Sequence, residues 1–157
     1  MGTPNSEVAE AAGRELVITR IFDAPRDLVF KTWIEPRHLL RWFGPRGFDT
    51  PSYTLDPRPG GAWRCCMVSP EGREHWVRGV FREVVEPERL IFTWAHENEH
   101  GAPGHETVVS VTFADHGDKT RLTLQQKTFE SITARDEHHN GWSSGLECLA
   151  EYLSALN

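Results

Sequence analysis

The sequence predicts the α+β class, with a curved antiparallel sheet of about six or seven strands wrapped around one long C-terminal helix. The helix is indicated by a proline-free segment from about Ile132 to Leu156. Large apolar residues recur there at intervals of four, three, four and three, which places them on one helix face; they are Trp142, Leu146, Leu149, Leu153 and Leu156. The sheet is indicated by the preceding chain, where short runs rich in Val, Ile, Thr, Phe and Trp alternate with turn residues.

The N-terminal part predicts one strand followed by two short helices. Leu16–Phe22 alternates enough for a strand. Asp23 is suited to cap the first helix, and Pro25 fits its first turn. The second helix is expected over Arg37–Phe43, and the glycines and proline of 44–47 end it.

The central part predicts six further strands joined by turns. Gly79 lies in the middle of one of them, which indicates a bend or bulge in a curved sheet. Ser131 or Thr133 is suited to cap the terminal helix. The expected strands are Phe48–Leu55, Trp63–Val68, His75–Val85, Arg89–Ala95, Thr107–Ala114 and Thr120–Phe129.

The length and charge of the chain limit the classes of function that it can have. The chain has 157 residues, so we expect one domain over 15–157, preceded by a loose tail over 1–14. Its net charge of −6 gives no general attraction to nucleic acid or to an anionic membrane. No apolar run approaches the roughly 20 residues of a membrane span, and the N-terminus lacks the pattern of a secretory signal. Three cysteines, two of them adjacent, do not suit a disulfide framework, so we expect a reducing cytoplasm; they are Cys65, Cys66 and Cys148.

Several local motifs, in this element order, resemble one known family. They are Phe22-Asp23-Ala24-Pro25 followed by Leu28-Val29-Phe30, the stretch from Glu35-Pro36 to Gly44-Pro45, Pro59-Gly60-Gly61, the stretch from Pro87-Glu88 to Thr93-Trp94, and Gly141-Trp142 with Leu146. The order is similar to the helix-grip superfamily (SRPBCC) of START lipid-transfer domains, polyketide cyclases and the birch-pollen allergen. Within that superfamily, the motifs resemble those of homologues of the activator of the heat-shock protein 90 ATPase. This resemblance extends over roughly Leu16 to Leu156. The resemblance implies a helix-grip fold with a cavity between the sheet and the terminal helix.

His96-Glu97-Asn98-Glu99-His100 matches the H-E-x-x-H pattern of zinc peptidases. That chemistry needs both histidines on one helical turn. Here the motif leaves an expected strand and enters a loop over 98–104 that contains glycines and a proline, which cannot prolong a helix. We therefore interpret it as a loop and expect no metal site.

Other polar residues have both a functional and a structural interpretation. His138-His139 near the start of the terminal helix is suited either to an acid–base pair at the cavity mouth or to a polar helix face. Glu83 is either a carboxylate inside an apolar site or, if a bulge near Gly79 reverses the faces, a solvent-facing one. Cys65, on the strand face assigned inward, is expected to behave as a small buried hydrophobe. No Gly-rich phosphate loop, Ser-His-Asp order or Cys metal spacing is present, so no cofactor and no catalytic residue is assigned.

The aromatic residues carry the functional hypothesis. They come from separate elements that the fold would bring together, either as a packed core or as the lining of a small-molecule site. Gly141 and Gly145, which flank Trp142 one helical turn apart, leave room either for close packing or for a ligand. The residues expected to line a ligand site are Trp33, Trp42, Phe43, Trp63, Cys65, Met67, Phe81, Trp94, Trp142 and Leu146.

We therefore expect a protein that binds a small apolar or aromatic molecule in a cavity beneath the terminal helix. Two alternatives follow from the resemblance: a co-chaperone that stimulates the heat-shock protein 90 ATPase, and an enzyme of the polyketide-cyclase type in which Glu83, His138 or His139 moves a proton. The sequence does not identify the ligand, and it leaves open whether the protein has a chaperone partner or forms a homodimer. It favours a binding function over catalysis.

Overall fold

A computed structural model describes residues 14–156 of the chain. The α+β class is confirmed, with seven strands, two short helices after the first strand and a long terminal helix. All of the expected tail except Arg14 lies outside the described residues. The elements are β1 (Leu16–Phe22), α2 (Arg26–Lys31), α3 (Pro36–Trp42), β2 (Asp49–Leu55), β3 (Ala62–Val68), β4 (Glu74–Val85), β5 (Arg89–Glu97), β6 (Pro103–His116), β7 (Lys119–Lys127) and α4 (Ile132–Leu156).

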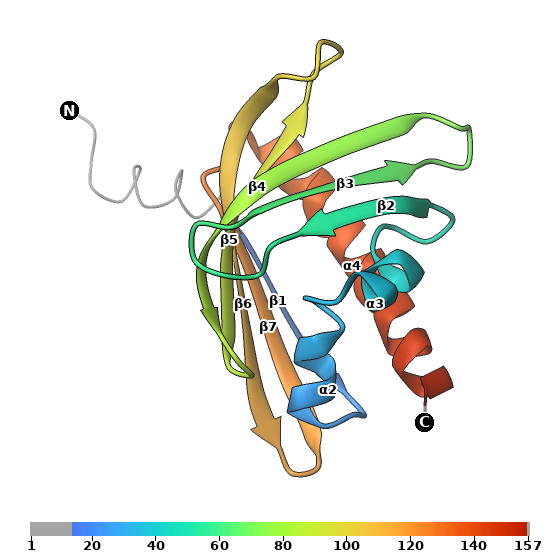
Figure 1. Cartoon of the computed structure of the whole chain (residues 1–157), viewed down its shortest axis with the longest axis vertical. Coiled ribbons are helices and arrows are strands. Elements are labelled where there is room, and N and C mark those ends of the chain that lie inside the picture. Colours follow the sequence, from blue (N-terminus) through green and yellow to red (C-terminus); the bar gives the residue numbers. More distant parts are fainter. Residues whose placement is uncertain (1–13, 157) are drawn as a thin grey trace, which may run out of the picture.

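The seven strands form one antiparallel sheet in the order β1-β7-β6-β5-β4-β3-β2. Because β1 and β2 lie at opposite edges of this sheet, the chain between them has to cross from one edge to the other. It does so through α2 and α3, as Figure 1 shows. The sheet curls, and α4 runs along its concave side (Figure 1). The arrangement leaves the first half of α4 facing the middle strands, where the pocket described below lies.

The terminal helix has the bounds expected from its periodicity. Its apolar face is buried, with exposed fractions of 6% or less at Trp142, Leu146, Leu149 and Leu153. The expectation for Leu156 is wrong, since that side chain is 45% exposed at the last residue of the helix. The cap is Ser131, whose Oγ accepts a hydrogen bond from the Ala134 N–H at 3.0 Å.

The two glycines of α4 differ in their surroundings. A Cβ on Gly145 would lie 3.2 Å from the carbonyl oxygen of Gly44, so the loop after α3 packs directly on the helix there. A Cβ on Gly141 would meet only Pro45, at an ordinary 3.8 Å. Close packing therefore accounts for Gly145, whereas nothing in the backbone requires Gly141.

The first short helix begins two residues after its expected position, and the second begins one residue before it. The N-cap of α2 is Pro25, not Asp23, and it makes no side-chain capping hydrogen bond. Pro36 occupies the first turn of α3, after Glu35 in an extended conformation. The strands β5 and β6 extend further into the polar hairpin than expected. Their pairing continues as far as Glu97 and Pro103. Hydrophobic patterning misses these ends, since they project beyond the core.

Strand β3 is buried on both faces near its middle. Trp63, Cys65 and Met67 are buried as expected. Cys66, on the other face, is also buried, so the interpretation of this strand as half-buried is wrong at that position. Its cross-strand neighbour is Trp76, whose ring is in turn covered by a guanidinium 3.9 Å away.

The pairing of β4 with β5 is interrupted at Gly79 and Val80, but the register shift falls after Phe81. The register with β5 shifts between Phe81 and Glu83. Glu83 consequently faces solvent, with 45% of its side chain exposed and its carboxylate 3.0 Å from Arg89, so the interpretation of it as a carboxylate inside an apolar site is wrong. Gly79 serves a different purpose: a Cβ there would lie 1.8 Å from the Thr93 carbonyl oxygen, which accepts a hydrogen bond from Trp63.

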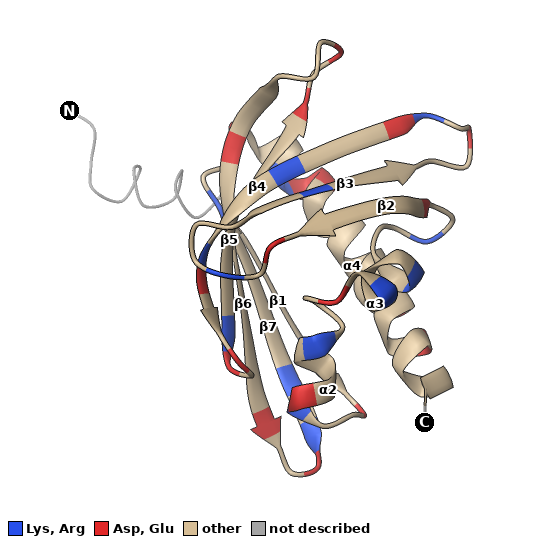
Figure 2. Cartoon of the chain, viewed as in Figure 1, with Lys and Arg blue, Asp and Glu red and all other residues tan. Residues whose placement is uncertain are grey.

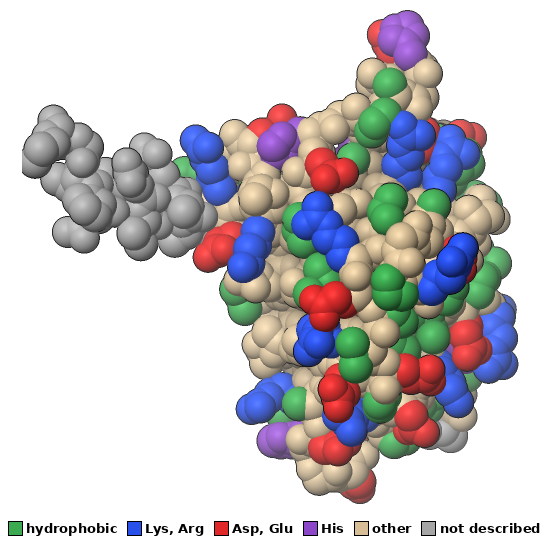
Figure 3. Space-filling model, turned by 60° about the vertical axis from the view of Figure 1, so that its left-hand side comes forward, with side chains coloured by type: hydrophobic (Ala, Val, Ile, Leu, Met, Phe, Trp, Pro, Cys, Tyr) green, Lys and Arg blue, Asp and Glu red, His purple; other side chains and the backbone are tan. Residues whose placement is uncertain are grey.

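The charged residues are dispersed over the strands, the loops and the ends of the helices (Figure 2). On the face drawn in Figure 3, acidic and basic side chains are interspersed with hydrophobic ones and form no large patch of one sign. Within the described chain, no helix has the length and apolar character needed to cross a membrane.

Candidate functional site

A pocket of about 310 Å³ opens beside the first half of α4. Its walls come from α4, from β3, β4 and β5, and from the end of α3 with the loop that follows it. Most of the lining is apolar, and the polar groups are histidines and one carboxylate. The lining residues are Trp42, Phe43, Gly44, Pro45, Phe48, Met67, His75, Trp94, His96, Glu137, His138, Gly141, Trp142 and Gly145.

Three aromatic rings from three elements form the apolar wall. The ring centroids of Trp94 and Trp142 lie 5.3 Å apart, and those of Phe43 lie 5.8 Å from Trp142 and 6.1 Å from Trp94. All three side chains are at least nine-tenths buried, so each ring position is fixed by its neighbours. A rigid aromatic wall of this kind suits a flat apolar molecule.

The ten residues expected to line a site divide into two groups. Trp42, Phe43, Met67, Trp94 and Trp142 border the pocket. All ten belong to the hydrophobic core, and the five that do not border this pocket are Trp33, Trp63, Cys65, Phe81 and Leu146. Trp33 stacks on Trp142 with a centroid distance of 5.8 Å and so supports the wall from behind.

Sequence reasoning missed part of the lining. Phe48 precedes β2, and its ring lies 5.8 Å from that of His75. His75 pairs across the β3–β4 hairpin with Met67, so both point to the same side of the sheet. The pairing of these two strands in a hairpin therefore predicts that His75 lies on the same side of the sheet as Met67. No sequence pattern places the loop residues Gly44 and Pro45 in the lining, because loop positions have no periodicity.

His96 and His138 form a hydrogen-bonded pair in the pocket wall. Their Nε2 atoms lie 3.1 Å apart. Nδ1 of His138 lies 2.7 Å from the Ala134 carbonyl oxygen, which can only accept, so this nitrogen carries a proton. In the neutral pair, Nε2 of His138 therefore accepts a hydrogen bond from the Nε2–H of His96. His139, the other half of the expected acid–base pair, is exposed and does not line the pocket.

His96 is held in its uncharged form. Desolvation, together with the neighbouring His138 and His75, lowers the pKa of His96 from 6.5 to about 4, although part of the residue is exposed to solvent. His96 is therefore neutral at pH 7. An uncharged imidazole supplies hydrogen bonds to a ligand and no counter-charge.

The H-E-x-x-H motif does not form a metal-binding helix. His96 and Glu97 end β5, and a turn follows in which Asn98 Oδ1 accepts hydrogen bonds from the backbone N–H groups of His100 and Ala102. The Glu97 carboxylate is 2.6 Å from Nε of Arg64, which lowers its pKa. Among residues 14–156, no three His, Cys, Asp or Glu side chains lie close enough together to hold a metal ion.

A buried chain of hydrogen bonds holds the pocket wall to the sheet. Nε1–H of Trp142 donates to Oε1 of Gln126 at 2.8 Å. The amide of Gln126 donates to the Thr107 hydroxyl at 2.8 Å, and this hydroxyl donates to the Trp94 carbonyl oxygen at 3.2 Å. The chain crosses from α4 through β7 and β6 to β5, so it positions two of the three wall rings.

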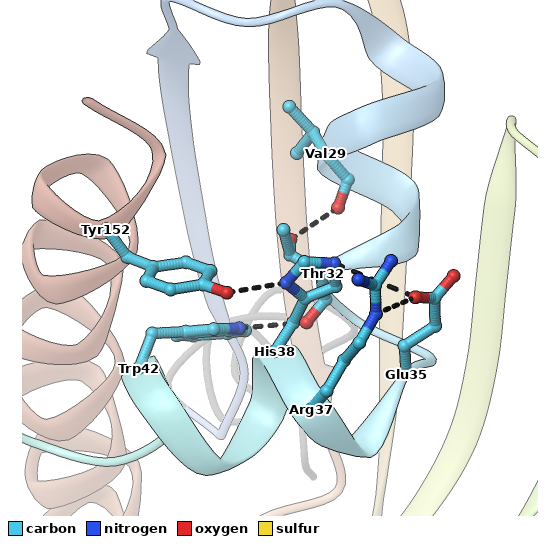
Figure 4. Close-up of polar contacts among 7 residues, drawn as sticks. All are labelled: Val29, Thr32, Glu35, Arg37, His38, Trp42 and Tyr152. Carbon is cyan, nitrogen blue, oxygen red and sulfur yellow. Dashed lines mark hydrogen bonds and ion pairs between the residues drawn. The ribbon is translucent and has the colours of Figure 1, made fainter. Parts of the chain in front are cut away.

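A second polar cluster joins α3 to the end of α4 (Figure 4). Nδ1 of His38 lies 2.6 Å from the Tyr152 hydroxyl, and its Nε2 lies 3.7 Å from the Glu35 carboxylate. Burial, with a contribution from Arg37, lowers the pKa of His38. Of the residues drawn in Figure 4, only Trp42 also lines the pocket. The cluster therefore fastens the helices that flank the pocket.

A curved antiparallel sheet that grips a terminal helix, with two short helices after its first strand, defines a helix-grip protein. The family model described as "Activator of Hsp90 ATPase homolog 1-like protein" matches residues 23–154, so the chain belongs to that family. This confirms the resemblance seen in the sequence motifs.

Solved structures from several bacteria share the fold. The AHSA1 protein from Silicibacter pomeroyi has 28% sequence identity and a TM-score of 0.85, covering 91% of this chain and 99% of its own. A protein from Arthrobacter aurescens has 26% identity and a TM-score of 0.83, covering 93% and 89%. A protein from Nitrosomonas europaea has 27% identity and a TM-score of 0.78, covering 92% and 96%. Among curated proteins, no match was found.

Proposed function

We propose that this protein binds a small apolar or aromatic molecule in the pocket between its sheet and α4. The observation that carries the proposal is the lining itself: Phe43, Trp94 and Trp142 form a fixed aromatic wall beside an opening of about 310 Å³. Concave sites with mostly apolar walls and a few polar groups are the usual places for small-molecule binding. The helix-grip fold, in which hydrophobic ligands are commonly bound, supports the same function.

The test is to fill the pocket from the helix. Gly141 borders the pocket, and its backbone tolerates a Cβ, so Gly141→Leu places a side chain in the pocket without a clash against the main chain. Leu also favours a helix by up to about 1 kcal/mol over Gly. Gly145→Leu is less suitable because of the contact with the Gly44 carbonyl.

A panel of apolar and aromatic compounds is screened by tryptophan fluorescence and thermal shift. We expect saturable binding to the wild-type chain and at least a tenfold loss of affinity in Gly141→Leu, with the melting temperature unchanged or raised. Asn140→Leu, at an exposed neighbouring position on the same helix, is the matched control and should bind as the wild type does. Equal binding to all three chains would refute the pocket as the site.

The two alternatives from the sequence stay predictions. The family description names an activator of the Hsp90 ATPase, and a pull-down followed by an ATPase assay with a bacterial homologue of that chaperone tests such a partner. A polyketide-cyclase activity now depends on His138, because Glu83 faces solvent and His139 lies outside the lining. Three free cysteines fit the expected cytoplasmic location.

A further inference from the structure

The terminal helix is anchored unevenly along its length. All buried residues of α4 lie at or after Trp142, and none of residues 132–141 is buried. The first half nevertheless supplies part of the pocket lining, including Glu137 and His138. The hydrophobic core therefore holds the second half of α4 firmly and the first half only weakly.

Polar contacts add to the anchoring of the second half. Arg46 donates its backbone N–H to Oγ of Ser144 at 2.7 Å, and its guanidinium lies 2.6 Å from the Glu151 carboxylate. Nearer the end of the helix, the Tyr152 hydroxyl lies 2.6 Å from Nδ1 of His38. Both α3 and the loop after it are thus joined to this half of α4.

Residues 132–140 are joined to the sheet mainly through His138. Among the described residues, the only hydrogen bond from a side chain of this segment to another element joins His138 to His96, with 3.1 Å between the Nε2 atoms. The His138 ring also packs near Phe129 and Trp94, at centroid distances of 5.0 and 6.2 Å. Ala134 is partly buried against the core. Loss of the contact with His96 would leave the segment with few ties.

Gly141 lies at the boundary between the two halves. No close packing requires a glycine there, because a Cβ would meet only Pro45, at 3.8 Å. Gly is the least favourable helix residue after Pro, so it weakens the helix at this position. A segment as short as 132–140 is also not stable alone, since isolated helices below about 12–15 residues are marginal in water.

We propose that residues 132–140 form a lid on the pocket, which opens at Gly141 and is held closed by the hydrogen bond between His96 and His138. Opening of the lid moves Glu137 and His138 away from the strands and enlarges the space beside the aromatic wall. Segments with few buried contacts are those that open locally in native proteins. The role of the lid in admitting a ligand rests on the proposed function, whereas its opening does not.

Amide hydrogen exchange of the ligand-free, ¹⁵N-labelled chain at pH 7 tests the lid. Amides 136–140 should exchange at least tenfold faster than amides 146–153, because the lid opens without the rest of the helix. Fraying of a helix end also speeds exchange, so variants are needed to separate the two causes.

His96→Phe keeps a ring on β5 but removes the hydrogen bond to the lid. Exchange of amides 136–140 should become about 2- to 10-fold faster, which is the effect of one net hydrogen bond, and amides 146–153 should not change. His75→Phe is the matched control, since His75 borders the same pocket from β4 and has no side-chain hydrogen bond to α4 among the described residues. It should leave both sets of amides unchanged.

Gly141→Ala tests the boundary and leaves the hydrogen bond between His96 and His138 in place. The better helix former should slow exchange of amides 136–140 about 4- to 5-fold. This result does not depend on whether His96→Phe folds.

The outcomes separate the lid from the proposed function. Equal exchange in the two halves of α4, an effect of His96→Phe no larger than that of His75→Phe, or unchanged exchange in Gly141→Ala would overturn the lid. None of these measurements uses a ligand, so each of these results leaves the proposed function standing. Failure of every aromatic compound to bind would instead refute the proposed function and the role of the lid in admitting a ligand.

Discussion

The hydrogen bond between Trp142 and Gln126 should anchor α4 to the sheet, and its contribution can be worked out from the structure. Gln126 is fully buried, and its Oε1 accepts from Trp142 at 2.8 Å. Trp142→Phe leaves that oxygen without a donor, which costs about 1–3 kcal/mol. The smaller ring loses about 1 kcal/mol more of contact with its aromatic neighbours. We expect a total near 3 kcal/mol, or a drop in melting temperature of about 6–12 °C.

A double-mutant cycle isolates the hydrogen bond itself. Gln126→Leu should cost about 1–3 kcal/mol, because it leaves the Trp142 N–H unpaired. The double variant removes both partners and should lose about 1–2 kcal/mol less than the sum of the single changes. Gln125→Leu, on the opposite face of the same strand, is the control and should change stability little. The assay is urea unfolding followed by far-ultraviolet circular dichroism; strictly additive losses would refute the anchoring role.

Three further predictions follow from individual residues. Because folding lowers the pKa of His96 from 6.5 to about 4, the unfolded chain binds more protons than the folded chain between these two pH values. The free energy of unfolding should therefore fall as the pH drops from about 6.5 to about 4. In His96→Gln, the midpoint of urea unfolding should depend less on pH over that range. Burial raises the pKa of Cys65 strongly and that of the partly exposed Cys148 less. A thiol reagent should therefore modify Cys148 first in the native protein and all three thiols in denaturant. A persistent disulfide would contradict this prediction. Since the Glu97 carboxylate is paired with Arg64, elemental analysis should find no stoichiometric zinc, and one zinc per chain that is lost in His96→Ala would be the opposing result.

The sequence was most informative where periodicity is regular. The intervals between Trp142 and Leu153 predicted α4 with its observed bounds, because a helix in contact with a sheet has to bury one continuous face. Strand β3 was also predicted correctly on its inner face. The wrong interpretation of Cys66 has a physical cause: its cover comes from a cross-strand neighbour, which alternation along one strand does not encode.

The pocket was less predictable than the fold. Whether a buried aromatic residue lines an opening or fills the core depends on the curl of the sheet, so Trp94 and Trp63 look alike in sequence and differ in place. The contact of His96 with His138 joins residues 42 positions apart and has no local signal. The sequence cannot decide which face Glu83 occupies, because one residue of register shift reverses the two faces of a strand.

The most direct test of ligand binding is to map a bound compound onto the chain by ¹H–¹⁵N correlation spectra. An apolar aromatic compound such as 2-acetylnaphthalene is titrated into the labelled protein at pH 7.5. The proposed function predicts saturable shifts at backbone amides that border the pocket, including Gly44, His75 and Gly141. Saturable shifts centred on the outer face of the sheet around Val80, or no saturable shift at all, would contradict it.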